Sequence, residues 1–247
     1  MFPNPNRMFQ NILNLFFPPV CSGCKAVLLS NENTICTVCR HEIPLTNHHL
    51  NPENEAFKKF YGRVPIEYAA AFVYFHKKGI VQELIHNLKY RGHEAIGTLL
   101  GKWYAEELKT NSILQTVDAI IPVPLHPKKL RERGYNQVTE FGKALAEELK
   151  IPFNTQILYR QVYSKTQSQK NRFGRTEGID TVFDVHFTES NHNKHFLLID
   201  DVITTGATLE VCAKALLKIP GTKVSIVCMT MADSYKINLY LLSINPI

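Results

Sequence analysis

The sequence lacks any apolar run approaching the ~20 residues that a membrane-spanning helix needs. It also lacks internal repeats and low-complexity tracts. Apolar residues make up 45% of the chain and charged residues 20%, which is the balance of an ordinary soluble protein. With 247 residues, the chain can form one full-sized domain and a small module.

The N-terminal stretch MFQNILNLFFPPV, residues 8–20, does not have the features of a signal peptide. Asn11 and Asn14 interrupt its apolar part, and no small-residue cleavage site follows. Four of its apolar residues share one helical face, which predicts a short helix docked on a core: Met8, Ile12, Leu15 and Phe16. The alternative, a helix lying on a membrane surface, is disfavoured because Arg7 is its only cation.

An acidic excess is also absent, since the net charge is +6 and the pI is about 8.9. A basic chain of this kind suits an anionic ligand, either a polyphosphate or a nucleic acid. The charge does not choose between these two ligand classes.

Cysteine is scarce and unevenly placed, which argues against a disulfide framework. Cys212 and Cys228 stand alone in apolar segments, whereas the other four form two CxxC pairs near the N-terminus. This pattern predicts a structural zinc site in a reducing, cytoplasmic environment, and its ligands would be Cys21, Cys24, Cys36 and Cys39. The alternatives are redox-active pairs or an iron–sulfur cluster. His41 follows the last cysteine, but four thiolates would already close the shell.

Hydrophobic patterning predicts an α/β fold with a parallel sheet, because strands and helices alternate along the chain. Expected strands span residues 67–76, 117–125, 155–160, 195–200 and 223–232. Expected helices span residues 79–90, 95–109, 134–150 and 207–219. The polar stretch at 44–55 is expected to be a linker or long loop.

The stretch FLLIDDVITTGAT, residues 196–208, carries the main chemical signal. Asp200 and Asp201 end a buried strand, and a Thr/Gly-rich turn then leads into a helix. In a parallel sheet, ligands bind at the carboxyl ends of the strands, and a helix N-terminus attracts phosphate. A sugar phosphate fits both features, with its hydroxyls or a Mg²⁺ ion on the acids. The alternative is a Thr-rich helix cap with solvated acids. No Gly-Lys-Ser/Thr ending is present, so this is not a Walker loop.

This stretch resembles the phosphoribosyl pyrophosphate (PRPP) signature of type I phosphoribosyltransferases. Among them, the whole chain is most similar to the ComF family of competence-associated phosphoribosyltransferase-like proteins. The resemblance also covers the four-cysteine module, LKYRG at 88–92, IPVPLHPKKLRERGYNQ at 121–137 and KTQSQKNR at 165–172. The tail from about Tyr235 has no counterpart, and GRTEGIDTVF replaces an expected Asn-Val.

The resemblance implies a type I phosphoribosyltransferase fold, a central parallel sheet flanked by helices, with an N-terminal zinc-ribbon module. Residues 1–50 would form the zinc-ribbon-like module with its leading helix. Residues 51–115 would form a hood-like segment that recognises an acceptor, and residues 116–247 the phosphoribosyltransferase core.

The resemblance also implies roles for individual residues. Asp200 and Asp201 would be the catalytic acids, engaging the ribose hydroxyls. The 5′-phosphate would lie on Thr204, Thr205, Gly206, Ala207 and Thr208. PRPP would bind with Mg²⁺, and its pyrophosphate would be neutralised by Lys128, Lys129, Arg131 and Arg133, although a solvated basic helix end would look the same. A flexible loop would close over PRPP with Lys165, Thr166, Gln167, Ser168, Gln169 and Arg172.

Two functions follow from the resemblance. One is a phosphoribosyltransferase-like protein that binds PRPP or ribose 5-phosphate with Mg²⁺ and supports the DNA-uptake machinery in natural transformation. The other is a non-catalytic protein that binds single-stranded DNA or senses nucleotides. Tyr90 and Tyr135 have basic neighbours and would stack on bases in the second case, unless they are packing residues.

Overall fold

The computed structural model describes residue 14 and residues 17–161 and 182–232. Three predictions fall outside these residues. They are the N-terminal helical face, the flexible loop at 165–172 and the tail after about residue 234. Within the described residues, no helix is both long and apolar enough to span a bilayer.

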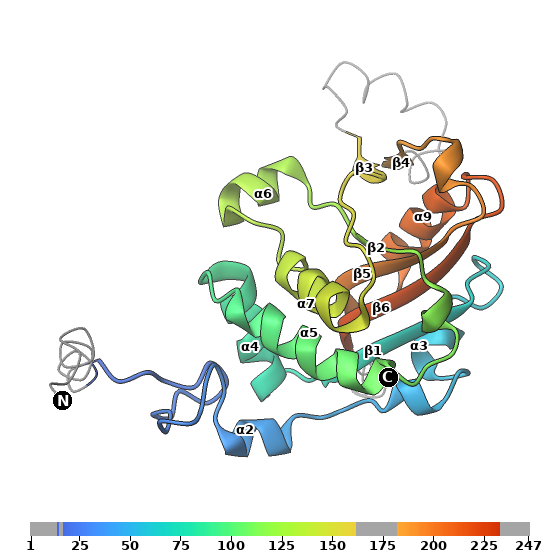
Figure 1. The fold of residues 1–247 in the computed structure, drawn as a ribbon. Coiled ribbons are helices and arrows are strands. Elements are labelled where there is room, and N and C mark those ends of the chain that lie inside the picture. The colour runs from blue at the N-terminus through green and yellow to red at the C-terminus, as the bar shows by residue number, and fades with distance from the viewer. Residues whose placement is uncertain (1–13, 15–16, 162–181, 233–247) are drawn as a thin grey trace, which may run out of the picture.

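A four-stranded parallel sheet forms the centre of the molecule and confirms the predicted α/β fold (Figure 1). Its order is β1 (Tyr68–Phe75), β6 (Lys223–Ala232), β5 (His195–Ile203) and β2 (Ala119–Pro122). All adjacent strands run in parallel, so their carboxyl ends meet at one edge of the sheet. Helices cover both faces, which explains why the central strands are almost continuously apolar.

Side chains of each strand alternate between two hydrophobic cores, one on each face of the sheet. Leu197 and Ile199 of β5 point into the core that contains α4 (Ile80–Tyr90), α5 (Ala95–Leu108) and α7 (Thr139–Leu149). Phe196 and Leu198 point into the other core, with α9 (Ala207–Leu216) and α3 (Glu55–Lys58).

The strand order reverses between β2 and β5, and this reversal creates the crevice that holds the candidate site. After α7, the chain pairs in parallel with the outer side of β2, where Ile120 N donates to Pro152 O at 2.8 Å and Asn154 N to Ile120 O at 2.9 Å. The chain then returns to β5 on the other side of β2. Helices α7 and α9 lie on opposite faces, as expected at a topological switch point, where ligands bind in open α/β sheets.

The expected strand at 155–160 is not part of the parallel sheet. Its last three residues form β3 (Leu158–Arg160), which pairs antiparallel with β4 (Phe183–Val185), a strand that the sequence did not predict. Residues 152–154 already occupy the position beside β2, so the chain leaves the sheet before β3 begins.

The segment at 44–55, expected to be a linker or long loop, packs along the open edge of β1. Thr46 N donates to Phe72 O at 3.0 Å and Tyr74 N donates to Pro44 O at 2.8 Å. The buried Asn54 donates through Nδ2 to Ala69 O at 2.8 Å. The segment therefore satisfies backbone groups that an exposed edge strand would leave open.

The remaining elements are short and connect the layers. They are α2 (Thr37–Glu42), α6 (Pro127–Arg133) and the 3-10 turns η1 (His48–Leu50), η2 (Leu114–Thr116) and η4 (Glu189–Asn191). Helix α7 begins at Thr139, five residues later than the start of the predicted range, because Gly134 ends α6 in a left-handed conformation with φ of 79°.

Candidate functional site

A cavity of about 290 Å³ lies at the switch point, beyond the carboxyl ends of β2 and β5. Residues after β2, residues of α6, the end of β5 and the turn into α9 all contribute to its wall. Its polar and charged lining residues are Lys89, His126, Lys129, Arg133, Gln137, Arg160, Asp200, Asp201, Thr204, Thr205 and Thr208.

Both predicted acids line this cavity, although β5 continues three residues beyond Asp200 to Ile203. Asp201 is buried and firmly held. Its Oδ2 accepts a hydrogen bond from Gln137 Nε2 at 2.7 Å and pairs with Lys89 Nζ at 2.8 Å. Thr230 Oγ1 also donates to its backbone carbonyl at 3.0 Å. Lys89 and Gln137 therefore fix the position of this carboxylate.

Asp200 is the less restrained acid. It is half-buried, and its Oδ1 accepts the Asp201 N–H at 2.8 Å. Burial, together with the neighbouring Asp201 carboxylate, raises the pKa of Asp200 to about 8, and the Asp201 N–H and Lys89 only partly offset these effects. A cation bound beside Asp200 would favour its ionised form, so this acid is available to a cation or to hydroxyl donors.

The turn at 204–208 lines the same cavity as the acids and ends in the N-terminus of α9. Thr204, Thr205 and Thr208 are exposed toward solvent. Gly206 has φ of +78°, a conformation that other residues rarely adopt, and a Cβ at that position would contact the Phe60 ring tightly at 3.0 Å, so both features favour glycine. The turn offers hydroxyls and backbone N–H groups, the donor set that holds a phosphate.

Arg63 supports this turn from outside the cavity. Its Nη1 donates to Thr205 O at 2.8 Å, and its other amino group forms an ion pair with Glu210 of α9. The arginine therefore ties the turn to the helix that follows it.

The predicted pyrophosphate residues divide into two pairs. Lys129 and Arg133, four residues apart on α6, line the cavity. Lys128 and Arg131 are not among the lining residues, and Lys128 lies 3.9 Å from the exposed Glu132. Helical spacing explains the division, because Lys129 and Arg133 are one turn apart and share the side of α6 that faces the cavity, whereas Lys128 and Arg131 do not.

Four polar lining residues were not assigned to the site from the sequence: Lys89 on α4, His126 before α6, Gln137 before α7 and Arg160 at the end of β3. The sequence did offer one signal for three of them, since Lys89 lies in the LKYRG motif at 88–92 and His126 and Gln137 in the motif at 121–137, both of which carried the resemblance. The spacing of these residues along the chain gives no indication that they meet.

A second pocket of about 240 Å³ adjoins the cavity and shares three of its basic residues. It is lined by Lys89, Tyr90, Gly92, Lys129, Glu132, Arg133 and Tyr135. Tyr90 is 64% exposed, and the Arg133 guanidinium lies 5.1 Å from its ring centre. Tyr135 instead packs, donating its hydroxyl to Leu88 O. The packing interpretation therefore holds for Tyr135 and not for Tyr90.

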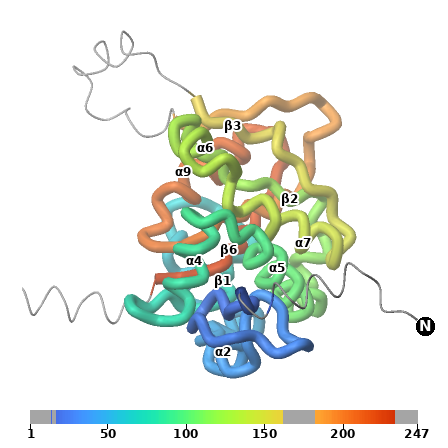
Figure 2. Tube along the Cα trace, turned by 90° about the vertical axis from the view of Figure 1, so that its left-hand side faces the viewer, coloured from blue at the N-terminus to red at the C-terminus, as the bar shows by residue number. Residues whose placement is uncertain are grey.

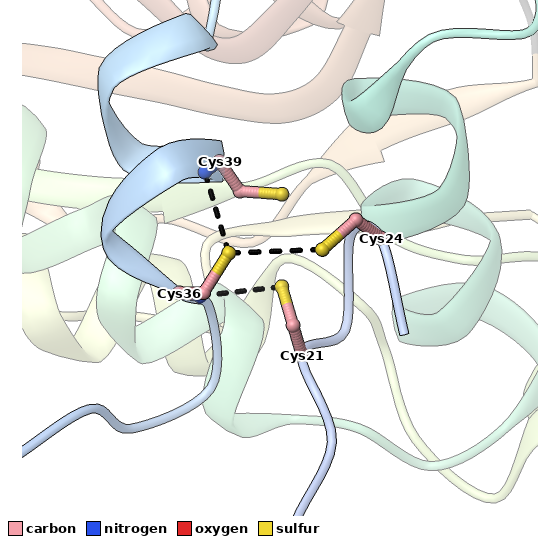
Figure 3. A group of neighbouring side chains, drawn as sticks. All are labelled: Cys21, Cys24, Cys36 and Cys39. Atoms are coloured by element: carbon pink, nitrogen blue, oxygen red, sulfur yellow. Dashed lines mark hydrogen bonds between the residues drawn. The ribbon is translucent and has the colours of Figure 1, made fainter. Parts of the chain in front are cut away.

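The four N-terminal cysteines converge on one point (Figure 3). Their sulfurs all lie within 4.8 Å of one another, and Cys24 Sγ and Cys36 Sγ are 3.6 Å apart. Tetrahedral zinc with Zn–S bonds of ~2.3 Å would place its sulfurs roughly 3.8 Å apart. His41 is exposed and is not part of the group.

Backbone N–H donors and neighbouring sulfurs shift the pKa values of two thiols in this cluster in opposite directions. Burial opposes ionisation of Cys21, but N–H groups of Cys24, Cys36 and Gly23 outweigh it and lower the pKa of the Cys21 thiol to about 6. Burial and the adjacent sulfurs strongly raise the pKa of the Cys39 thiol. Four thiols that compete for negative charge in one pocket suit a dication, which would stabilise all of them as thiolates.

Comparison with known proteins agrees with this architecture. Residues 139–238 match the model of the phosphoribosyl transferase domain. Competence protein F of Haemophilus influenzae is 26% identical over 213 residues, which cover 83% of this chain and 93% of that protein.

Two further relatives align over similar lengths. The DNA utilization protein YhgH of Escherichia coli K12 is 24% identical over 85% of this chain and 89% of its own length. Competence protein ComFC of Bacillus subtilis is 26% identical over 87% of this chain and 84% of its own length. The chain therefore contains a phosphoribosyl transferase domain with the type I phosphoribosyltransferase fold, and over most of its length, the N-terminal cysteine group included, it is similar to competence proteins of the ComF type.

Proposed function

We propose that the protein binds PRPP or a related sugar phosphate, together with Mg²⁺, in the cavity at the switch point. One observation carries this proposal: the acid pair and the Thr/Gly turn face the same 290 Å³ cavity. The acids suit vicinal ribose hydroxyls, and the turn suits the 5′-phosphate. A sugar phosphate is a ligand class that needs both groups in one cavity.

The basic side of the cavity would hold the pyrophosphate. Lys129 and Arg133 line it from α6, and Arg160 lines it from β3. Arginine can bind phosphate oxygens bidentately, and lysine supplies a point charge. Mg²⁺, when bound with PRPP, would neutralise further pyrophosphate charge, and of the two acids Asp200 is the one whose carboxylate Lys89 and Gln137 do not engage.

The corresponding reaction is displacement at ribose C1. A nitrogen nucleophile would form the new C1–N bond, and the C1–O bond would break with its electron pair leaving on pyrophosphate. The protein would contribute positioning and charge stabilisation, since the transition state resembles an oxocarbenium ion. The hood-like segment at 51–115 would contact the acceptor.

The names of the relatives extend the proposal to a cellular role. Two of them are competence proteins, and one is a DNA utilization protein. We propose that this chain likewise supports DNA uptake, with zinc as the structural ion of its cysteine group.

The second pocket favours one further candidate, binding of single-stranded nucleic acid. Tyr90 offers an exposed ring beside Lys89, Lys129 and Arg133. Base stacking on such a ring beside backbone-binding cations is the usual mode of single-strand recognition. Binding of this kind would not require a reaction or a ligand at Asp200 and Asp201.

Calorimetric titration with PRPP and Mg²⁺ tests the sugar-phosphate proposal. Asp200→Asn should lower affinity at least about tenfold, since a charge-assisted contact contributes about 1.5–3 kcal/mol. Asp118→Asn is the matched control, because Asp118 is partly exposed at the opposite end of the sheet and pairs with Lys194. Equal affinities for the wild type and Asp200→Asn would reject the assignment.

A fluorescence titration with a labelled oligonucleotide at several salt concentrations tests the second candidate. Tyr90→Ala should weaken binding, by about 1–3 kcal/mol for each stacked base that is lost. Tyr61→Ala, which removes another exposed tyrosine (82% exposed), should leave affinity unchanged. No binding by the wild type at low salt would end this candidate.

A further inference from the structure

We propose that the cysteine module and helix α4 act as one brace that sets the position of Lys89 in the cavity. Occupancy of the cysteine cluster by metal and binding of ligand in the cavity would then favour each other. The identity of the ligand rests on the proposed function, whereas the brace itself rests on contacts between described residues.

The first contacts join the cysteine module to α4, which lie side by side in the fold (Figure 2). Asn87 Nδ2 donates to the carbonyl oxygen of Ser22 at 2.7 Å, and both residues are buried, with 4% and 8% exposure. Ser22 directly follows the ligand Cys21. At the other end of α4, a Cβ on Gly23 would lie 2.9 Å from Ile80 Cγ2. The first knuckle therefore contacts both ends of the helix.

The next contacts join α4 to the acid pair. Lys89 lies two residues beyond Asn87, and its Nζ is 2.8 Å from Asp201 Oδ2. The Lys89 side chain is only 18% exposed. It lines both the cavity and the adjoining pocket, so a small displacement of α4 would change both.

The end of α4 has little freedom to move independently of this brace. The Asn87 carbonyl accepts N–H donations from Arg91 at 3.0 Å and His93 at 3.4 Å. Asn87 Oδ1 also accepts from Arg91 Nη1 at 3.1 Å. One buried asparagine thus connects the knuckle, the helix end and the turn that follows.

Energetic coupling follows from this arrangement. A small metal module draws much of its folding free energy from the ion, so loss of metal would release the Ser22 carbonyl from Asn87. Asn87 would then keep a buried amide without its partner, which is unfavourable. Because such coupling is reciprocal, sugar phosphate in the cavity should also raise the affinity of the cluster for metal.

The first experiment measures affinity for PRPP with Mg²⁺ by calorimetry and zinc content by metal analysis, in the full-length protein. Asn87→Ala should keep its zinc and bind PRPP at least about fivefold more weakly, the lower end of typical coupling. Asn54→Ala is the matched control, since Asn54 is a buried asparagine that donates to three carbonyls away from α4. Equal losses of affinity in both variants would overturn the proposal.

The second experiment does not depend on PRPP. Acetic anhydride labelling with mass spectrometry measures the reactivity of Lys89 in the wild type, in Asn87→Ala and in the wild type after zinc chelation. Lys89 should react slowly in the wild type and severalfold faster in the other two samples. Lys102, with 49% side-chain exposure, should react equally in all three.

The two experiments separate the possible failures. If the wild type does not bind PRPP, the ligand assignment fails and Lys89 labelling alone decides the brace. If Asn87→Ala does not fold, the chelated wild type decides it. Unchanged Lys89 reactivity after chelation would overturn the brace.

Discussion

Asp200 lies beside a second carboxylate in a half-buried position, and this setting makes its ionisation dependent on the fold. An aspartate in an unfolded chain has a pKa of about 3.9. In the folded protein the pKa of Asp200 is about 8, so the native state holds a proton that the unfolded state has lost. This contribution to stability is fully present below about pH 4 and is lost as pH rises through 8.

Asp200→Asn should therefore flatten the dependence of stability on pH between 4 and 8. In the wild type this residue alone should lower the free energy of unfolding by at most about 1.4 kcal/mol per pH unit in that window. The variant should gain stability relative to the wild type as pH increases. Chemical denaturation at a series of pH values measures the difference, and parallel curves for the two proteins would contradict the pKa shift.

At the scale of elements, α5 and α7 make the closest helix contact over the sheet. Gly101 of α5 faces α7 so closely that a Cβ there would lie 2.7 Å from both Ala144 Cβ and Phe141 O. Such an approach brings α7 against β2 and thereby fixes the residues that precede α7, including Gln137.

Gly101→Ala should separate these helices and destabilise the protein by about 1–3 kcal/mol, the usual cost of overpacking. The exposed neighbour Lys102 provides a control, because Lys102→Ala should change stability by no more than about 0.5 kcal/mol. Thermal denaturation of both variants distinguishes the outcomes. An unchanged melting temperature for Gly101→Ala would show that α5 can move away without loss.

At the scale of the whole molecule, the cysteine module is continuous with the main core. Cys21, Cys36 and Cys39 belong to the same buried cluster as residues of α4 and α5. Loss of one ligand should consequently affect more than the knuckles.

Cys36→Ser should lose zinc and loosen residues 17–45, because a four-ligand structural site does not hold with three thiolates. Metal analysis and hydrogen exchange measure the two effects. Cys212→Ala, which alters a buried cysteine outside the cluster, should retain the metal. Absence of stoichiometric zinc from the wild type would refute the predicted metal site.

Much of this molecule could be predicted from its sequence, since strand and helix periodicity and the acid–turn motif are local signals. The parallel sheet and its layers follow from them. The separate β3–β4 pair could not be predicted from local signals, because it forms outside the sheet only when residues 152–154 occupy the position beside β2. The place of Lys89 in the cavity also depends on a long-range contact and was not predicted, because Lys89 lies more than a hundred residues from Asp201 along the chain.

A crystal structure of the protein with ribose 5-phosphate and Mg²⁺ tests most directly where a sugar phosphate lies in the cavity. We expect the phosphate within hydrogen-bonding distance of the N–H groups of the turn at 204–208. The ribose hydroxyls should face Asp200 and Asp201. A ligand found outside this cavity, or a reversed orientation with the phosphate against the acids, would contradict the account.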